Sequence, residues 1–315
     1  MPTVSQTSRR GRVAHWIIII IVLVIMLIYL IPIYWVVTTS FKPFKAVTAI
    51  PPKVLFRPEI TSYVKLFTKR SIVRSEEELV EKRASAKWYE RRVLQQGQTI
   101  TGMSPFPNRL FNSFISAIVS TIAAVALGTF TAYGFSRFKV KGEGDLLFLI
   151  LSTRMLPPVV VTIPLFLMYR FLGLTDTRFG LILLYTLMNV SFVTWVMKGF
   201  IDEIPKEYEE AAMVDGYTRF EAFRKIVLPQ AVTGIAATSV FCFIFAWNEY
   251  AFALIMTTRR AQTAPPFIPS QFGVGVVDWG MIAAGASIFL IPVAVFTFLL
   301  RKHLLRGVTF GAIRK

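Results

Sequence analysis

The chain has 315 residues, and 54% of them are hydrophobic, a larger share than soluble globular domains carry. Its net charge of +17 at pH 7 is typical of proteins that bind nucleic acid. The placement of the basic residues, described below, argues against such a partner. The single cysteine, Cys242, excludes an intrachain disulfide, and the two histidines, His15 and His303, beside the first and last apolar runs, argue against a metal site.

Six long apolar runs follow one another along the chain. The first, residues 16–39, exceeds the roughly 20 residues that a helix needs to cross about 30 Å of hydrocarbon. It lacks a signal-peptide cleavage pattern, so we expect it to be retained. Because unpaired backbone groups are costly in lipid, every run should be helical. The others are residues 110–135, 146–169, 179–200, 231–256 and 281–300, and together the runs predict an all-α membrane protein with six transmembrane helices.

The distribution of Lys and Arg predicts the orientation of these helices. Sixteen lie in the N-terminal tail 1–15, the loops after the second and fourth runs, and the C-terminal tail 301–315, against four in the opposite short loops. Basic residues of short loops are retained in the cytoplasm. Both termini are therefore expected to be cytoplasmic, with the excess charge beside anionic lipid headgroups, and nucleic acid is not expected as a partner.

Residues 40–109 form a long segment on the predicted outer side. It carries 14 Lys and Arg, but long loops count little toward orientation. Ser75 and Glu78 form a capping-box pattern and Gly97 a stop signal, which predict a surface helix over residues 75–96. Its seven-residue repeat of Leu79, Ala86 and Val93 fits either a partner helix or, as we favour, packing on its own protein.

The loop between the fourth and fifth runs, residues 205–229, has the signals of two short helices joined by a turn. Pro205 suits a first helical turn, and acidic residues follow it, where they complement the helix dipole. Gly216 follows Asp215 where the chain must reverse, because glycine tolerates positive φ. A second capping box, from Thr218 to Glu221, starts the next helix, and Phe220, Phe223 and Val227 recur at helical spacing along it.

This loop resembles the EAA motif of ABC importer permeases. The spacing E-A-A-x3-G-x9-I-x-L-P is met by Glu210, Ala211, Ala212, Gly216, Ile226, Leu228 and Pro229. The resemblance implies that these residues, with Asp215 before the turn, form a coupling helix seated on an ATPase subunit. Packing of the loop on its own bundle is the alternative. Segments at 152–158, 245–254 and 306–315 resemble the carbohydrate-uptake branch, of the maltose-permease type.

The resemblance implies a type I ABC importer permease fold, with residues 110–300 as its core, in a bacterial inner membrane. It implies as partners a second permease subunit, two ATPase subunits and an extracytoplasmic solute-binding protein. The chain has no G-x-x-x-x-G-K-[ST] phosphate loop. ATP and Mg²⁺ are therefore expected on the ATPase subunits, with no catalytic residue, cofactor or metal on this chain. The C-terminal tail is expected either at the ATPase or at the membrane surface.

Polar residues within the apolar runs are candidates for the translocation path or a gate, because ionisable groups in a bilayer usually face protein or water. They are Arg154, Asn189, Asn248 and Glu249. For Arg154 we favour a structural or gating pair over contact with the solute. Pro157, Pro158 and Pro164 should bend the third span.

Two rival functions remain at this stage. A secondary transporter would show inverted repeats and an ion site near the membrane midplane, and a membrane-embedded enzyme would need a clustered acid, base or metal set. Neither pattern is evident. The cargo is not identified by the sequence, and sugars, polyols, glycerol phosphate and sulfonated sugars all fit.

Overall fold

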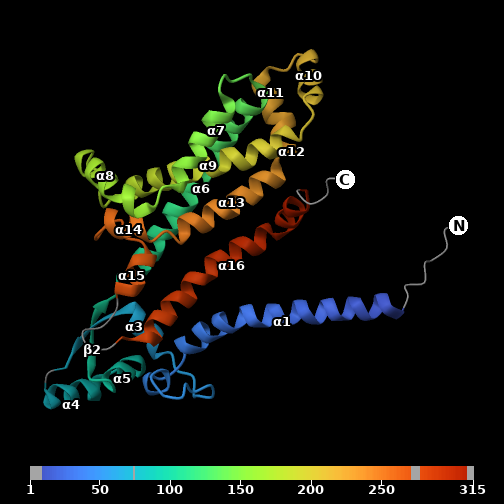
Figure 1. Ribbon diagram of the computed structural model, residues 1–315. Helices are drawn as coiled ribbons and strands as arrows, with labels where there is room; N and C mark the ends of the chain where they lie inside the picture. Colours follow the sequence, from blue (N-terminus) through green and yellow to red (C-terminus); the bar gives the residue numbers. More distant parts are fainter. Residues whose placement is uncertain (1–8, 74, 271–276, 311–315) are drawn as a thin grey trace. The chain divides into compact units, whose positions relative to one another are not determined.

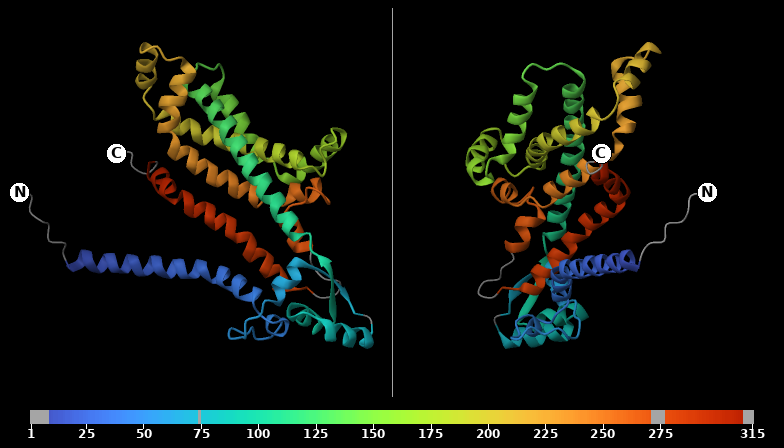
Figure 2. Two further views of the ribbon diagram at one scale, coloured as in Figure 1. Left: turned by 180° about the vertical axis from the view of Figure 1, so that it is seen from behind. Right: turned by 45° about the vertical axis from the view of Figure 1, so that its right-hand side comes forward.

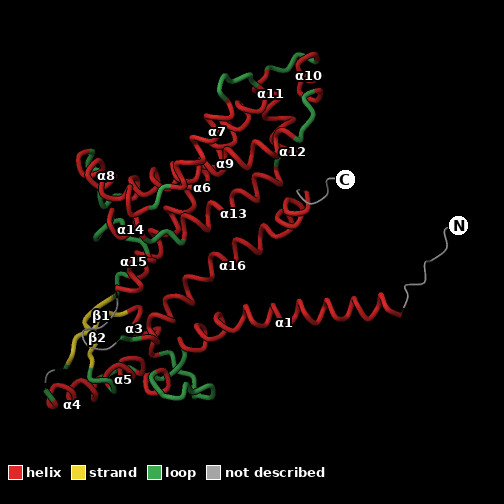
Figure 3. The backbone as a smooth tube through the Cα atoms, in the orientation of Figure 1, coloured by secondary structure: helices red, strands yellow, loops and turns green. Residues whose placement is uncertain are grey.

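The computed structural model describes residues 9–73, 75–270 and 277–310. The regular secondary structure of the described part is helical apart from one two-stranded antiparallel sheet, drawn yellow in Figure 3. The chain divides into two compact units, Met1–Ser104 with Gln271–Ile288, and Pro105–Ser270 with Phe289–Lys315. Residues 1–8 of the N-terminal tail and 311–315 of the C-terminal tail lie outside the described residues, so the expectation for the C-terminal tail stays a prediction.

The first unit begins with the long helix α1 and continues through a segment of short helices and the strands β1 and β2 (Figure 1). In the candidate span His15–Ser40 of α1, no residue of the apolar 18-residue window is buried against this chain, whereas Ser40 at the end of the span is buried. The elements of the first unit are α1 (Arg9–Ser40), α2 (Phe44–Val47), α3 (Thr61–Phe67), β1 (Thr68–Ile72), α4 (Glu76–Ser85), α5 (Trp88–Leu94), β2 (Gln98–Met103) and the start of α16 (Trp279–Phe310).

A buried ion pair holds the segment before the second span to the start of α16. Lys65 Nζ lies 2.6 Å from Asp278 Oδ2, and the two side chains are 5% and 15% exposed. Arg70 of β1 lies 4.0 Å from the same carboxylate. Burial lowers the pKa of Arg70, while the charge of Asp278 opposes that shift. The single carboxylate therefore compensates two cations in a part of the chain with little exposed surface.

The helix predicted over residues 75–96 is two helices. Helix α4 ends at Ser85, Ala86 is extended, and α5 begins at Trp88. The break has a local cause, because Glu90 Oε2 accepts the backbone N–H of Lys87 at 2.8 Å and so caps a new helix. The seven-residue repeat therefore does not form one apolar face. Ala86 and Val93 are buried within the chain, as the favoured interpretation, packing on its own protein, requires.

The second unit holds the remaining helices. Figures 1 and 2 show α6, α9 and α13 running beside one another. Its elements are α6 (Phe106–Arg137), α7 (Glu143–Ser152), a 3₁₀ turn (Thr153–Met155), α8 (Pro158–Phe171), α9 (Arg178–Asp202), α10 (Glu207–Val214), α11 (Arg219–Ala222), a π-helical turn (Phe223–Val227), α12 (Leu228–Gln230), α13 (Val232–Trp247), α14 (Ala251–Met256), α15 (Ala264–Ser270) and the remainder of α16.

Helices α6 and α9 pack closely because α6 has a glycine at the crossing. A Cβ built on Gly128 would lie 2.5 Å from Val193 Cβ, so no larger residue fits without a shift. Val193 is fully buried there. On α13, Trp247 stacks on Phe289 with ring centroids 4.7 Å apart, and its Nε1 donates to the Phe289 carbonyl at 3.0 Å. These contacts give the unit a rigid apolar centre.

Four described helices are long and apolar enough to span a membrane, and up to six spans result if each of two bent helix pairs counts as one. The first, second, fourth and sixth runs match α1, α6, α9 and α16. The third run is not one helix, because α7 and α8 meet at 93°. The fifth run is also interrupted, since α13 ends at Trp247 and α14 begins only at Ala251. The bend that the prolines predict for the third run is therefore present, and the interruption of the fifth run corrects the expectation of one helix over residues 231–256.

Candidate functional site

Residues 205–230, which we call the elbow, form the predicted pair of helices joined by a turn. Helix α10 ends at Val214, and Gly216 adopts φ +91° in the turn, the left-handed conformation expected of it. Thr218 then caps α11. Its N–H donates to Glu221 Oε2 at 2.9 Å while its Oγ1 accepts the Glu221 N–H at 3.2 Å. Pro205 lies just before α10 and outside its first turn, which corrects that detail of the prediction.

The aromatic stripe of the elbow packs on the end of α6. Phe223 is buried, and its ring centroid lies 4.5 Å from that of Tyr133 and 5.2 Å from that of Phe130. Val227 is also fully buried. Phe220 stacks on Phe130 at 6.5 Å but is 60% exposed. The second helix of the elbow is therefore held by the bundle on one side and free on the other.

The residues of the EAA-like motif divide into a buried and an exposed group. Ala212 is buried, and Ile226 and Leu228 are half-buried. Glu210, Ala211, Asp215, Gly216 and Pro229 are exposed. The exposed group lies beside large apolar side chains that also face outward, above all Val214, which is 88% exposed. An exposed apolar surface with carboxylates at its edge suits contact with another protein.

A buried ion pair that the sequence analysis missed fixes the first helix of the elbow. Glu209 accepts a hydrogen bond from Arg137 Nε, and their side chains are 5% and 3% exposed. Tyr133 Oη also donates to Glu209, at 2.8 Å, and Arg137 Nη2 donates to the Ile204 carbonyl at 2.9 Å. From sequence, Glu209 was one of several acids suited to the helix dipole. Arg137, the basic residue at the end of the second span, was the sequence signal that Glu209 has a partner.

Arg154 lies in the 3₁₀ turn at the bend of the third span, between α7 and α8. Pro157 and Pro158 follow it, and their missing N–H groups and fixed φ explain the bend there. Pro164 lies within α8. The guanidinium stands over the rings of Phe245, at 4.6 Å, and Phe192, at 5.3 Å. Among the described residues it pairs with no carboxylate, so the expected ion pair is absent there and the rings of two other helices hold it instead.

Glu249 lies in the break between α13 and α14 and acts as a cap. Its carboxylate accepts the N–H groups of Phe252 and Ala253, at 2.8 and 2.9 Å, and the hydroxyl of Tyr185 at 3.1 Å. Asn248 is exposed and donates back to the Ile244 carbonyl of its own helix. Asn189 is buried in α9. The four polar candidates therefore do not form one cluster of hydrogen bonds or ion pairs in the described structure.

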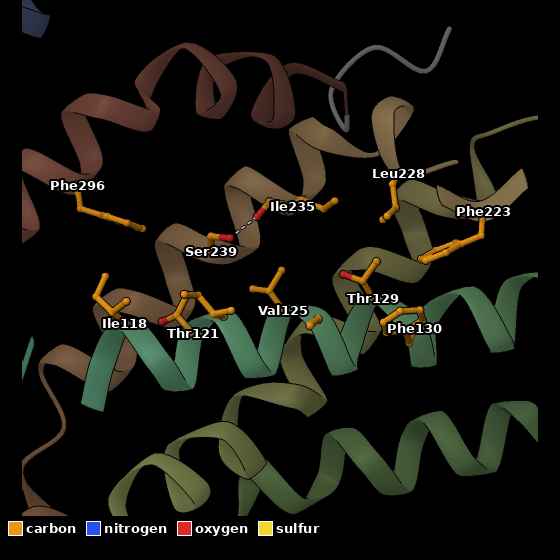
Figure 4. A pocket seen from close by; sticks show the side chains of 12 residues that line it. Ile118, Thr121, Val125, Thr129, Phe130, Phe223, Leu228, Ile235, Ser239 and Phe296 are labelled. Carbon is orange, nitrogen blue, oxygen red and sulfur yellow. Dashed lines mark hydrogen bonds between the residues drawn. The ribbon is translucent and has the colours of Figure 1, made fainter. Parts of the chain in front are cut away.

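An apolar groove of about 440 Å³ lies beside the elbow (Figure 4). Side chains of α6, the elbow, α13 and α16 line it, among them Val125, Phe223, Leu228 and Phe296. The Ser239 hydroxyl donates to the Ile235 carbonyl of its own helix at 2.7 Å and leaves the wall apolar. In the described ranges, no three His, Cys, Asp or Glu side chains are grouped as a metal site would need.

Residues 124–310 match the family described as the binding-protein-dependent transport system inner membrane component. The match covers more than half of the chain and includes the elbow. The chain belongs to this family. It is accordingly a multi-pass inner-membrane permease subunit of an ABC importer, a transport component and not an enzyme, and the resemblance found in the EAA-like motif is confirmed.

Relatives of this permease agree with that assignment. The probable ABC transporter permease protein y4oR of Sinorhizobium fredii is 30% identical over the full length of both chains. The trehalose transport system permease protein SugB of Mycobacterium tuberculosis is 36% identical over 66% of this chain and 77% of its own. A bacterial ABC transporter involved in the import of alginate has a chain of the same fold, with a TM-score of 0.67 at 19% identity, covering 96% of this chain and 100% of that one.

Proposed function

We propose that this permease imports a sugar or sugar-like solute and that the elbow couples its helices to an ATPase subunit. The single observation that carries the coupling role is the exposed, rigidly held EAA-like turn. Glu210 and Gly216 face outward while Glu209, one residue before Glu210, is locked to α6. The sugar assignment is supported by the trehalose permease and the alginate importer described above.

The proposed complex contains this chain, a second permease subunit, two ATPase subunits and an extracytoplasmic solute-binding protein. ATP and Mg²⁺ bind the ATPase subunits. Closure of the ATPase dimer moves the elbow and opens the path outward, and hydrolysis resets it. Coupling of this kind requires that nucleotide and solute favour shared global states. The bias of basic residues in the short loops supports a cytoplasmic location for both termini and the elbow.

Co-purification and transport test the coupling role. Glu210→Lys reverses the charge of the exposed motif carboxylate, and Glu207→Lys is its control on the same exposed side of α10. We expect Glu210→Lys to lose ATPase subunits and transport with the chain still inserted, and the control to keep both. Normal coupling in Glu210→Lys and in Gly216→Pro would refute the elbow assignment.

The cargo and the orientation need separate experiments. The binding protein that co-purifies with the complex is screened with trehalose, maltose and an alginate oligosaccharide, and failure to bind any sugar would contradict the proposed cargo class. For orientation, a cysteine at the exposed Asp215 is treated with a membrane-impermeant maleimide. Labelling only after the cells are opened is expected, and labelling of intact spheroplasts from outside would place the elbow on the wrong side.

A further inference from the structure

A continuous chain of polar contacts leaves the elbow through the buried Glu209–Arg137 pair. Arg137 Nη1 donates to the Ser136 hydroxyl at 2.8 Å. That hydroxyl donates to Asp202 Oδ1, at the end of α9, at 2.5 Å. Three elements, α10, α6 and α9, are therefore joined by side chains whose donors and acceptors are matched.

The same chain of contacts continues to α7. Lys198 Nζ donates to Asp202 Oδ2 at 2.7 Å and lies 3.0 Å from Glu143 Oε1. Glu143 is the first residue of α7 and therefore the start of the bent third span. The Lys198 and Glu143 side chains are 20% and 35% exposed, far more than the Arg137–Glu209 pair at the other end. The contacts are thus most buried at the elbow and more accessible at Asp202, which is 43% exposed, and at the third span.

The last contact matters most because α7 packs beside α9 without a buried residue of its own. None of the ten residues of α7, all of them described, is buried. Helices α6 and α9, by contrast, are locked by apolar packing such as that of Gly128 on Val193. A movement of the α6–α9 pair would therefore not carry the first turn of α7 with it through buried packing. A salt bridge between Lys198 and Glu143 supplies that connection.

We infer that the contacts from Glu209 through Arg137, Ser136, Asp202 and Lys198 to Glu143 transmit displacement of the elbow to the third span. Lys198 and Glu143 are positioning residues in this scheme. The inference rests on the proposed coupling function of the elbow. Separating a buried pair leaves uncompensated charges, so α6 follows α10 when the elbow moves, and the more exposed Lys198–Glu143 contact passes the motion on to α7.

Distance measurements between spin labels test this link in the assembled complex. Labels are placed at Leu127→Cys on α6 and Met155→Cys at the bend, both exposed positions, with Cys242→Ser as background. Distances are measured without nucleotide and after trapping with MgATP and vanadate. The test variants are Lys198→Gln, Glu143→Gln and their combination. Lys198→Arg is the conservative rescue, and Lys141→Gln is the control at an exposed lysine without a carboxylate partner among the described residues.

The unmodified chain, Lys198→Arg and Lys141→Gln should show a change in distance on trapping. Lys198→Gln and Glu143→Gln should lose at least half of that change, and the double variant no more than either, while ATPase subunits still co-purify and still trap nucleotide. A full change in Lys198→Gln, or additive losses in the double variant, would overturn the link and leave the elbow assignment standing. Absence of bound ATPase or of any change in the unmodified chain would overturn both.

Discussion

Arg137, the last residue of α6, and Glu209, in the first helix of the elbow, form an ion pair that solvent barely reaches. The adjacent carboxylate, Glu210, is exposed. Two neighbouring glutamates therefore do different work. Glu209 fixes α10 to the bundle. Glu210 stays exposed on the surface of the elbow, where the EAA-like motif is proposed to meet the ATPase.

Glu209→Ala should strongly destabilise the chain. It leaves the Arg137 guanidinium buried without its carboxylate, and breaking a buried pair in this way costs about 3–5 kcal/mol. Glu209→Gln should cost less, because its amide oxygen still accepts from Tyr133. Thermal unfolding in detergent compares both with Glu207→Ala, an exposed position on the same helix. Equal melting temperatures for Glu209→Ala and Glu207→Ala would contradict the role of this pair.

Gly216→Ala and Gly199→Ala should shift stability in opposite directions. A Cβ meets nothing within 4 Å at either position, so packing is not the cause. At Gly216 the φ of +91° is unfavourable for alanine by about 1–2 kcal/mol. In the helical backbone at Gly199, alanine should stabilise by roughly 0.5–1 kcal/mol. The measurement is the unfolding midpoint of each variant, and a shift of the same sign in both would rule out the backbone explanation.

Gly128→Ala should disrupt the crossing of α6 and α9. The added methyl meets Val193 at 2.5 Å, and overpacking of this kind costs about 1–3 kcal/mol. Trimming the opposing side chain, in the double variant with Val193→Ala, should recover part of that loss. Gly134→Ala on the same helix, where the Cβ meets nothing within 4 Å, is the control. Strictly additive losses in the double variant, measured by thermal unfolding, would show that the two positions do not meet.

Asp176 should control the order of the loop after α14. Burial acts to raise its pKa, but backbone N–H donors from Thr258 to Ala261 outweigh that effect and lower the pKa to about 2. A lowered folded-state pKa means that the carboxylate stabilises the loop above pH 3.8, the ordinary value, and that this stabilisation is lost as pH falls through about 2.

Hydrogen exchange of amides 258–261, corrected for intrinsic rates, checks this expectation. Protection should be constant from pH 7 to about 5 and decline below about 4, as the lowered pKa requires. Asp176→Asn should lose much of the protection already at pH 7, while Asp145→Asn, an exposed acid in α7, should not. Unchanged protection in Asp176→Asn would show that the four amides have another anchor.

Local signals predicted the elbow well because each acts within a few residues. Thr218 and Glu221 lie in one turn, and Gly216 needs no distant partner to favour a left-handed turn. The breaks at 86–87 and 248–250 are local as well, but they depend on Glu90 and Glu249 using their carboxylates as caps. An apolar run conceals such a choice, since hydropathy measures how readily a segment enters lipid and not where its helix ends.

The sequence by itself determined that this chain enters a membrane, which loops are basic, and where the EAA-like turn lies, because hydropathy, charge count and capping depend on neighbouring residues. Only the tertiary structure decided that Glu209 is buried while Glu210 is exposed, that Arg154 rests on Phe192 and Phe245, and that Lys198 reaches Glu143. Those pairings join residues tens of positions apart, and which partner a charge meets is set by how the helices cross.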